Sequence, residues 1–149
     1  MKYYFLLLLL IPFKSVSQNL DYNDLVNILS MSIIESNEYI ENKGYRIFEN
    51  GSTTKNTLSY IWDKQGNNKS ISYLLITLDK SKNYKMVWYQ FHSQQHFNIL
   101  KNHLDKVKYK LVDSYIEFES IYYDYKSPMY SVTLSKGENS YIFSIKNNK

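Results

Sequence analysis

Twice along this chain, apolar residues at helical spacing give way to apolar residues that alternate with period two. The helical stretches cover residues 22–42 and 93–107, and an alternating stretch follows each of them. One face of a helix repeats every three or four residues, whereas one face of a strand repeats every second residue. We therefore expect an α+β fold in which two helices pack on antiparallel sheet.

The first helix has signals at both ends. Asp21 is suited to the N-cap, and Asp24 lies in the first turn, where a carboxylate favours the positive end of the helix. Lys43 and Gly44 are typical of a helix C-terminus. Between these ends an apolar stripe recurs at helical spacing: Tyr22, Val26, Leu29, Ile33 and Ile40. The spacing predicts one helix over residues 22–42.

The alternating stretches predict two sets of antiparallel strands joined by tight turns. We expect strands over residues 45–49, 58–63, 71–78 and 84–91 before the second helix, and over residues 109–112, 115–125, 129–135 and 141–146 after it. Turn residues at 65–68, 80–83 and 136–139 separate several of them.

The two halves have similar sequences as well as a similar order of elements. The segment 43–47 resembles 107–111, and Leu58-x-Tyr60-x-Trp62 resembles Ile121-x-Tyr123-x-Tyr125. This similarity predicts a degenerate tandem αββββ repeat with halves 18–92 and 93–149. The alternative is that a chain with 16 tyrosines produces such a similarity by composition alone.

The predicted layout resembles two groups of exported proteins, the β-lactamase inhibitor proteins and the small outer-membrane assembly lipoproteins. The resemblance lies in the order of the elements and not in a motif, and this chain lacks the cysteine that carries the lipid in the second group. It implies an exported protein, and only by analogy of fold.

Residues 1–17 have the pattern of a secretory signal peptide. Lys2 precedes an apolar run over residues 3–13, and small residues occupy positions 15 and 17. The run is shorter than the roughly 20 residues that span a membrane as a helix. We expect export to the periplasm or beyond, cleavage before Gln18, and a single soluble domain over residues 18–149.

The composition of the chain excludes stabilisation by disulfides and argues against nucleic acid as a partner. The chain has no cysteine, so disulfides cannot stabilise it and burial must. Its 18 basic residues, set against 14 acidic ones, include a single arginine, Arg46. Nucleic-acid binders favour a dense basic stripe with arginine, so we expect no nucleic acid as a partner.

The sequence contains no motif of a known catalytic, cofactor or metal site. His92, His96 and His103 have no acidic residue among them, and we expect solvent-exposed side chains flanking the helix. Glu117 and Glu119 share a predicted strand face, where charges usually protect an edge. We therefore predict no catalytic residue, no cofactor and no metal. An alternative is a small secreted hydrolase with its site among these histidines and glutamates.

Aromatic side chains remain as candidates for a binding surface. Tyrosine and tryptophan provide large contact areas at low entropic cost. The candidate binding face comprises Tyr60, Trp62, Trp88, Tyr89, Tyr123 and Tyr125. The alternative is that these rings fill the core.

We expect a non-enzymatic envelope or extracellular protein that binds another macromolecule, such as a protein of the cell envelope, through its aromatic-rich sheet face. A self-associating structural protein with residues 129–135 as an unpaired edge strand is the other alternative.

Overall fold

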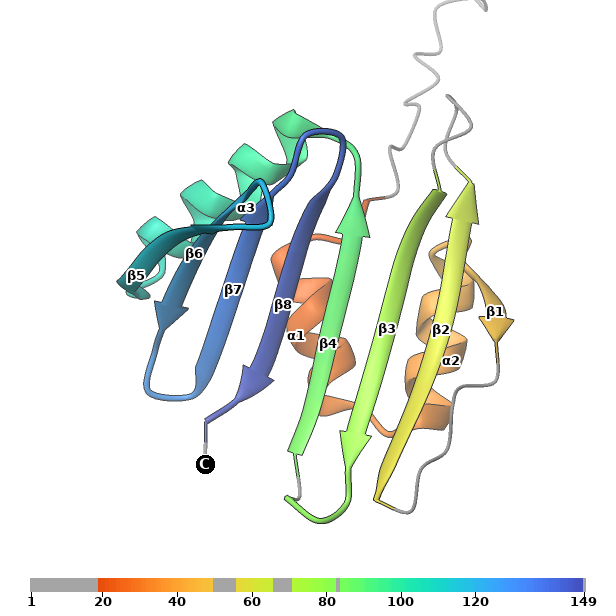
Figure 1. Cartoon of the computed structure of the whole chain (residues 1–149). Coiled ribbons are helices and arrows are strands. Elements are labelled where there is room, and N and C mark those ends of the chain that lie inside the picture. Colours follow the sequence, from red (N-terminus) through yellow and green to blue (C-terminus); the bar gives the residue numbers. More distant parts are fainter. Residues whose placement is uncertain (1–18, 50–55, 66–70, 83, 149) are drawn as a thin grey trace, which may run out of the picture.

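The structure, a computed structural model, describes residues 19–49, 56–65, 71–82 and 84–148. The predicted signal peptide lies outside the described residues. The α+β fold is confirmed: three helices, rather than the two expected, pack on one face of an eight-stranded antiparallel sheet (Figure 1). Within the described residues, no helix lies on the other face, which we call the open face.

The sheet consists of two four-stranded meanders that meet at their last strands. The strand order is β1-β2-β3-β4-β8-β7-β6-β5, so β4 pairs with β8 at the centre, while β1 and β5 form the edges. The helices are α1 (Tyr22–Ser30), α2 (Ile33–Asn42) and α3 (Gln94–Lys106). The strands are β1 (Arg46–Glu49), β2 (Thr57–Gln65), β3 (Ile71–Asp79), β4 (Tyr84–Phe91), β5 (Lys110–Glu117), β6 (Ser120–Lys126), β7 (Tyr130–Lys136) and β8 (Tyr141–Asn147).

The prediction of one helix over residues 22–42 is wrong, because the chain breaks at Met31 and starts a new helix. Ser32 is the N-cap of α2: its hydroxyl accepts a hydrogen bond from the Glu35 amide at 3.3 Å, and the Glu35 carboxylate accepts one from the Ser32 amide at 2.8 Å. This capping box satisfies two amides at the start of α2. At its end Gly44 adopts a φ of 83°, so the predicted glycine terminus is confirmed.

The predicted strands over residues 109–112 and 115–125 are also wrong in their boundaries. The chain reverses at Phe118 and Glu119, both in the left-handed region with φ of 46° and 61°. Neither residue is typical of a tight turn, which usually uses glycine or asparagine at such angles. The predicted break near Asp113 is instead a bulge, where the β5–β6 register shifts between Leu111 and Asp113.

Residues 129–135 do not form an edge strand, because β7 lies between β6 and β8. The prediction that this segment is the unpaired edge is therefore wrong. Each half of the chain is a helical segment followed by a four-stranded meander, although the first half has two helices and the second has one. A tandem duplication stays a prediction.

The core lies between the helices and the sheet. Alternate residues of the central strands face the helices and are buried, which is the expected result for strands covered on one side. The largest of these side chains are Trp62, Tyr89, Tyr125, Phe91 and Phe143, and helix residues Leu25, Ile28, Ile40 and Leu100 pack against them. In the absence of cysteine, this burial is the main source of stability.

Candidate functional site

The residues of the candidate binding face lie on both sides of the sheet. Trp62, Tyr89 and Tyr125 face the helices, and none of them is more than 2% exposed. Tyr60 and Tyr123 are half-buried and pack against the same core. The structure therefore brings five of the six residues into or against the core.

Hydrogen bonds hold the buried aromatic rings to the helical side of the molecule. The Trp62 indole donates to Asn37 Oδ1 in α2 at 2.9 Å. The Tyr45 hydroxyl donates to the Tyr89 hydroxyl at 3.3 Å, and burial raises the pKa of Tyr89 to about 12. These contacts give Trp62 and Tyr89 a structural role.

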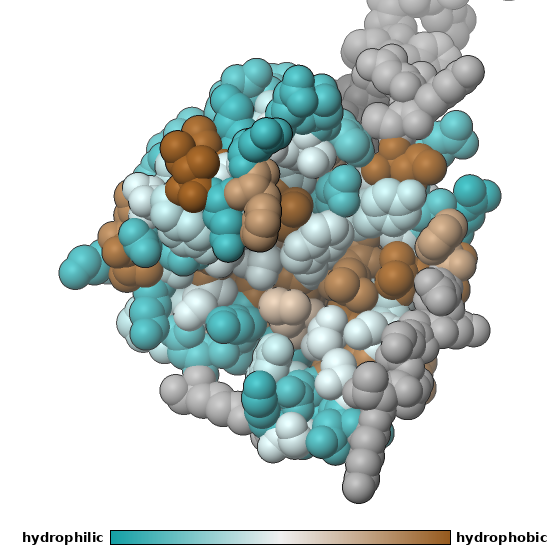
Figure 2. Space-filling view, in the orientation of Figure 1, coloured by the Kyte–Doolittle hydropathy of each residue, from teal (hydrophilic) through white to brown (hydrophobic). Residues whose placement is uncertain are grey.

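Trp88 is the one candidate that lies on the open face. It is half-buried, and it occupies a row across three strands in which Ile61 pairs with Leu75 and Leu75 pairs with Trp88. We call Ile61, Leu75 and Trp88 the apolar band. Phe48 and Tyr73 extend it toward β1, with their rings 6.1 Å apart. Figure 2 shows brown apolar side chains gathered over these strands.

A second aromatic pair lies on the open face at the other side of the sheet. Tyr115 and Tyr122 are directly opposite each other in the β5–β6 ladder. Their rings stack with centroids 5.1 Å apart and planes within 6° of parallel. The sequence pattern does not single out Tyr115 and Tyr122, because alternation along a strand does not show which of its two sides the helices cover.

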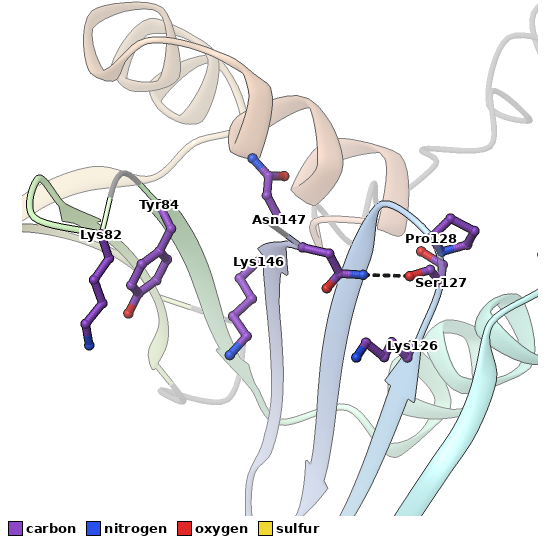
Figure 3. A pocket seen from close by; sticks show the side chains of 8 residues that line it. Lys82, Tyr84, Lys126, Ser127, Pro128, Lys146 and Asn147 are labelled. Carbon is purple, nitrogen blue, oxygen red and sulfur yellow. Dashed lines mark hydrogen bonds between the residues drawn. The ribbon is translucent and has the colours of Figure 1, made fainter.

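A cavity of about 780 Å³ lies at the end of the sheet where β4 begins and β6 and β8 end. Its lining residues are Lys82, Tyr84, Lys126, Ser127, Pro128, Lys146, Asn147 and Asn148. Figure 3 shows Lys82, Tyr84, Lys126 and Lys146 extending toward the same side. We call this cavity the lysine cavity.

Strand register brings the lysines together. Lys126 and Lys146 both pair with Ser131, from opposite sides, so the two lysines lie in one row of the open face. Two strand spacings separate their backbones by roughly 10 Å. On its other side Lys146 pairs with Met86 of β4, and Met86 lies two residues before Trp88 in the same strand. The lysine cavity and the apolar band are therefore neighbouring parts of one face.

The lysine cavity is positively charged. Its lining contains three lysines and no carboxylate. Lys82 has Asp79 nearby, with Nζ and Oδ2 4.0 Å apart, but neither Lys126 nor Lys146 forms an ion pair with any described residue. Three amines facing one space create a field that attracts anions and carboxylates.

A smaller cavity of about 400 Å³ adjoins this end of the sheet and includes Lys85 in its lining. Lys85 faces the helices and is 9% exposed. Its amine donates to the Met31 carbonyl at 2.7 Å, to the Ser36 hydroxyl at 3.2 Å and to the Ile28 carbonyl. Burial lowers the pKa of Lys85 to about 8. These bonds satisfy carbonyls at the end of α1, so the residue joins α1 to the sheet.

The residues considered for catalysis are dispersed. His96 is buried, contrary to the exposed position expected, and its Nε2 donates to the Leu20 carbonyl at 2.9 Å. His103 packs against the Tyr22 ring with centroids 4.4 Å apart. Glu117 ends β5 and Glu119 lies in the turn, so they do not share a strand. None of these residues lines either cavity described above.

His92 lies apart from the other two histidines, at the end of β4. One ring nitrogen is 2.8 Å from the Asn139 carbonyl and the other is 3.0 Å from the Ile71 carbonyl. Across the described ranges, no group of three or more histidine and acidic side chains is arranged to hold a metal ion.

Comparison of the chain with protein-family models, with curated protein sequences and with solved structures finds no match. Among the helices that the structure describes, none is both long and apolar enough to cross a membrane.

Proposed function

We propose that this protein is an exported, non-enzymatic binding protein that holds a partner protein on the open face of its sheet. The observation that carries the proposal is the apolar band beside the lysine cavity, on a face that no described helix covers. Export rests on the signal-peptide pattern of residues 1–17.

The chemistry of the face specifies the partner. The rings of Trp88 and Tyr73 offer apolar contact area, and tryptophan and tyrosine often dominate binding energy when a partner excludes water from them. The lysines at the end of the face would attract aspartate and glutamate side chains and orient the approaching partner. A partner with an exposed apolar side chain flanked by acidic residues would fit both the apolar band and the lysine cavity.

Binding is favoured over catalysis by what lines the two cavities. The side chains there offer amines, a phenol, a hydroxyl and amides, with one carboxylate at Asp79 in the smaller cavity. Catalysis of hydrolysis by side chains usually requires a nucleophile or water positioned beside a general base. The Asp79 carboxylate instead accepts hydrogen bonds from its own turn, including one from the Ser81 hydroxyl at 2.6 Å.

The test is capture of envelope proteins on immobilised wild-type protein and on two open-face variants, Trp88→Ala and the double variant Lys126→Glu/Lys146→Glu. Ile99→Ala removes a comparably apolar side chain from the outer face of α3, where Ile99 is 54% exposed. Lys106→Glu/Lys108→Glu makes the same charge change at two exposed lysines outside the sheet, at the end of α3 and directly after it. Circular dichroism checks that each variant is folded.

The proposal expects one protein partner that binds the wild type and both control variants and is lost from both open-face variants. Capture that is equally strong on all five proteins contradicts it. Recovery of an anionic polysaccharide in place of a protein overturns the choice of a protein partner.

A further inference from the structure

The edge strand β5 is exposed along its whole length. All eight of its residues are exposed, including Leu111 at 46%, Val112 at 54% and Ile116 at 77%. An edge strand presents unpaired backbone amides and carbonyls, and proteins normally shorten or cover such edges. The opposite edge follows that pattern, because β1 has only four residues. The β5 edge is long, apolar and uncovered by any described residue.

The sequence of β5 is complementary to itself when it is read in the opposite direction. With Ser114 placed opposite Ser114 of a second copy, and with Val112 left unpaired as the extra residue of the bulge, Lys110 faces Glu117 and Leu111 faces Ile116. Opposite charges and apolar pairs directly across two antiparallel strands are favourable. A two-fold axis through Ser114 repeats each pair, which gives two Lys110–Glu117 pairs and two Leu111–Ile116 pairs.

The bulge in β5 is what allows this register. Lys110 and Glu117 are seven residues apart, so in a regular strand they would point to opposite faces. In this structure both point to the open face, because their β6 partners are Lys126 and Ser120, which are six residues apart. Leu111 and Ile116 likewise both face the helical side, opposite Tyr125 and Ile121. Paired residues of the two copies would therefore meet on the same face.

Within one molecule the charges of this strand are poorly matched. Lys110 lies directly opposite Lys126 in the β5–β6 ladder, and like charges in that position are destabilising. In the self-paired register, Glu117 of the second copy would lie on the other side of Lys110. A second copy thus supplies the negative charge that the β5–β6 ladder lacks at this position.

We propose that the protein forms a symmetric dimer in which β5 pairs antiparallel with β5 of a second copy. The pairing joins two eight-stranded sheets into one continuous sheet. Because the two-fold axis is perpendicular to the sheet, both open faces lie on the same side of the dimer. The inference does not depend on what the open face binds.

The test is analytical ultracentrifugation of the purified protein from low micromolar concentrations to about 1 mM, since a contact made by one eight-residue strand of each copy supports modest affinity. The wild type is compared with Lys110→Glu, with Glu117→Lys and with the double variant Lys110→Glu/Glu117→Lys. Each single change replaces two attractive pairs by two repulsive ones. We expect each to weaken dimerisation about tenfold or more.

Two further measurements test the proposed register by restoring opposite charges at the paired positions 110 and 117. The double variant should dimerise like the wild type. An equal mixture of the two single variants should form heterodimers, because each charged side chain at positions 110 and 117 then faces one of opposite sign. Both substitutions are at exposed positions, and circular dichroism controls for folding. A protein that stays monomeric throughout, a dimer that is insensitive to both single changes, or the failure of both rescues would overturn the proposal.

Discussion

Lys85 should make the stability of this protein increase between neutral and mildly alkaline pH. Its amine lies under the end of α1 and is bonded to the Met31 carbonyl, the Ile28 carbonyl and the Ser36 hydroxyl. Burial disfavours the charged form, which lowers the pKa from 10.5 in an exposed lysine to about 8. The folded protein therefore releases this proton well before the unfolded chain does.

The sign follows from proton binding in the two states. Between the folded pKa and the unfolded pKa, the unfolded chain binds more protons, so the free energy of unfolding rises with pH. With pKa values of about 8 and 10.5, the contribution grows by about 1.3 kcal/mol between about pH 7 and about pH 9. Higher pH is less informative, because the buried tyrosines resist ionisation while exposed ones in the unfolded chain ionise near pH 10.

The assay is urea unfolding of the wild type and of Lys85→Met at both pH values. Methionine has a similar length and no titrating group, so subtracting the two pH dependences removes what the other groups contribute. We expect a difference of about 1 kcal/mol, with the wild type gaining more from the rise in pH. Equal pH dependences in the two proteins, or a smaller gain in the wild type, would refute the reasoning.

Three further changes test the packing. Trp62→Ala should lower the free energy of unfolding by about 3–5 kcal/mol, as measured by urea titration, because it empties a fully buried site. Tyr125→Phe should change stability by less than about 1 kcal/mol in thermal unfolding, because the buried Tyr125 hydroxyl makes no hydrogen bond of good geometry in the described part of the chain, although Lys101 and Asp105 lie close to it. Ser32→Ala should cost about 1 kcal/mol in urea unfolding by removing the α2 cap, and an unchanged midpoint would contradict that role.

Sequence periodicity predicted the elements that are governed by local signals. The second helix was expected over residues 93–107, and α3 covers Gln94–Lys106. The break at Met31 was missed because the apolar stripe continues in register from Leu29 to Ile33. The capping box of Ser32 and Glu35 was the signal that could have revealed it.

The turn at Phe118 and Glu119 could not be read from composition, because neither residue favours the left-handed conformation that both adopt. Asp113 and Ser114 do have turn chemistry, but tertiary pairing with β6 extends the strand through them as a bulge. Strand pairing here overrides local preference.

The candidate site was harder to predict than the fold. Period two shows that neighbouring aromatics point to opposite sides, but it does not show which side the helices cover, so Trp62 and Trp88 looked equivalent. The lysine cavity depends on strand order as well, since Lys126 and Lys146 are brought into one row by β7. Strand order is a long-range property that short sequence patterns do not contain.

The central position of β8 has a consequence for synthesis. Val87 of β4 pairs with Ile145 of β8, so the contact that joins the two meanders forms only after nearly all of the described chain has been made. Until then β4 and β7 both present unpaired edges, and closing such distant contacts is slow. A nascent chain that ends after β7 would contain two incomplete sheets, each prone to pair with strands of other molecules.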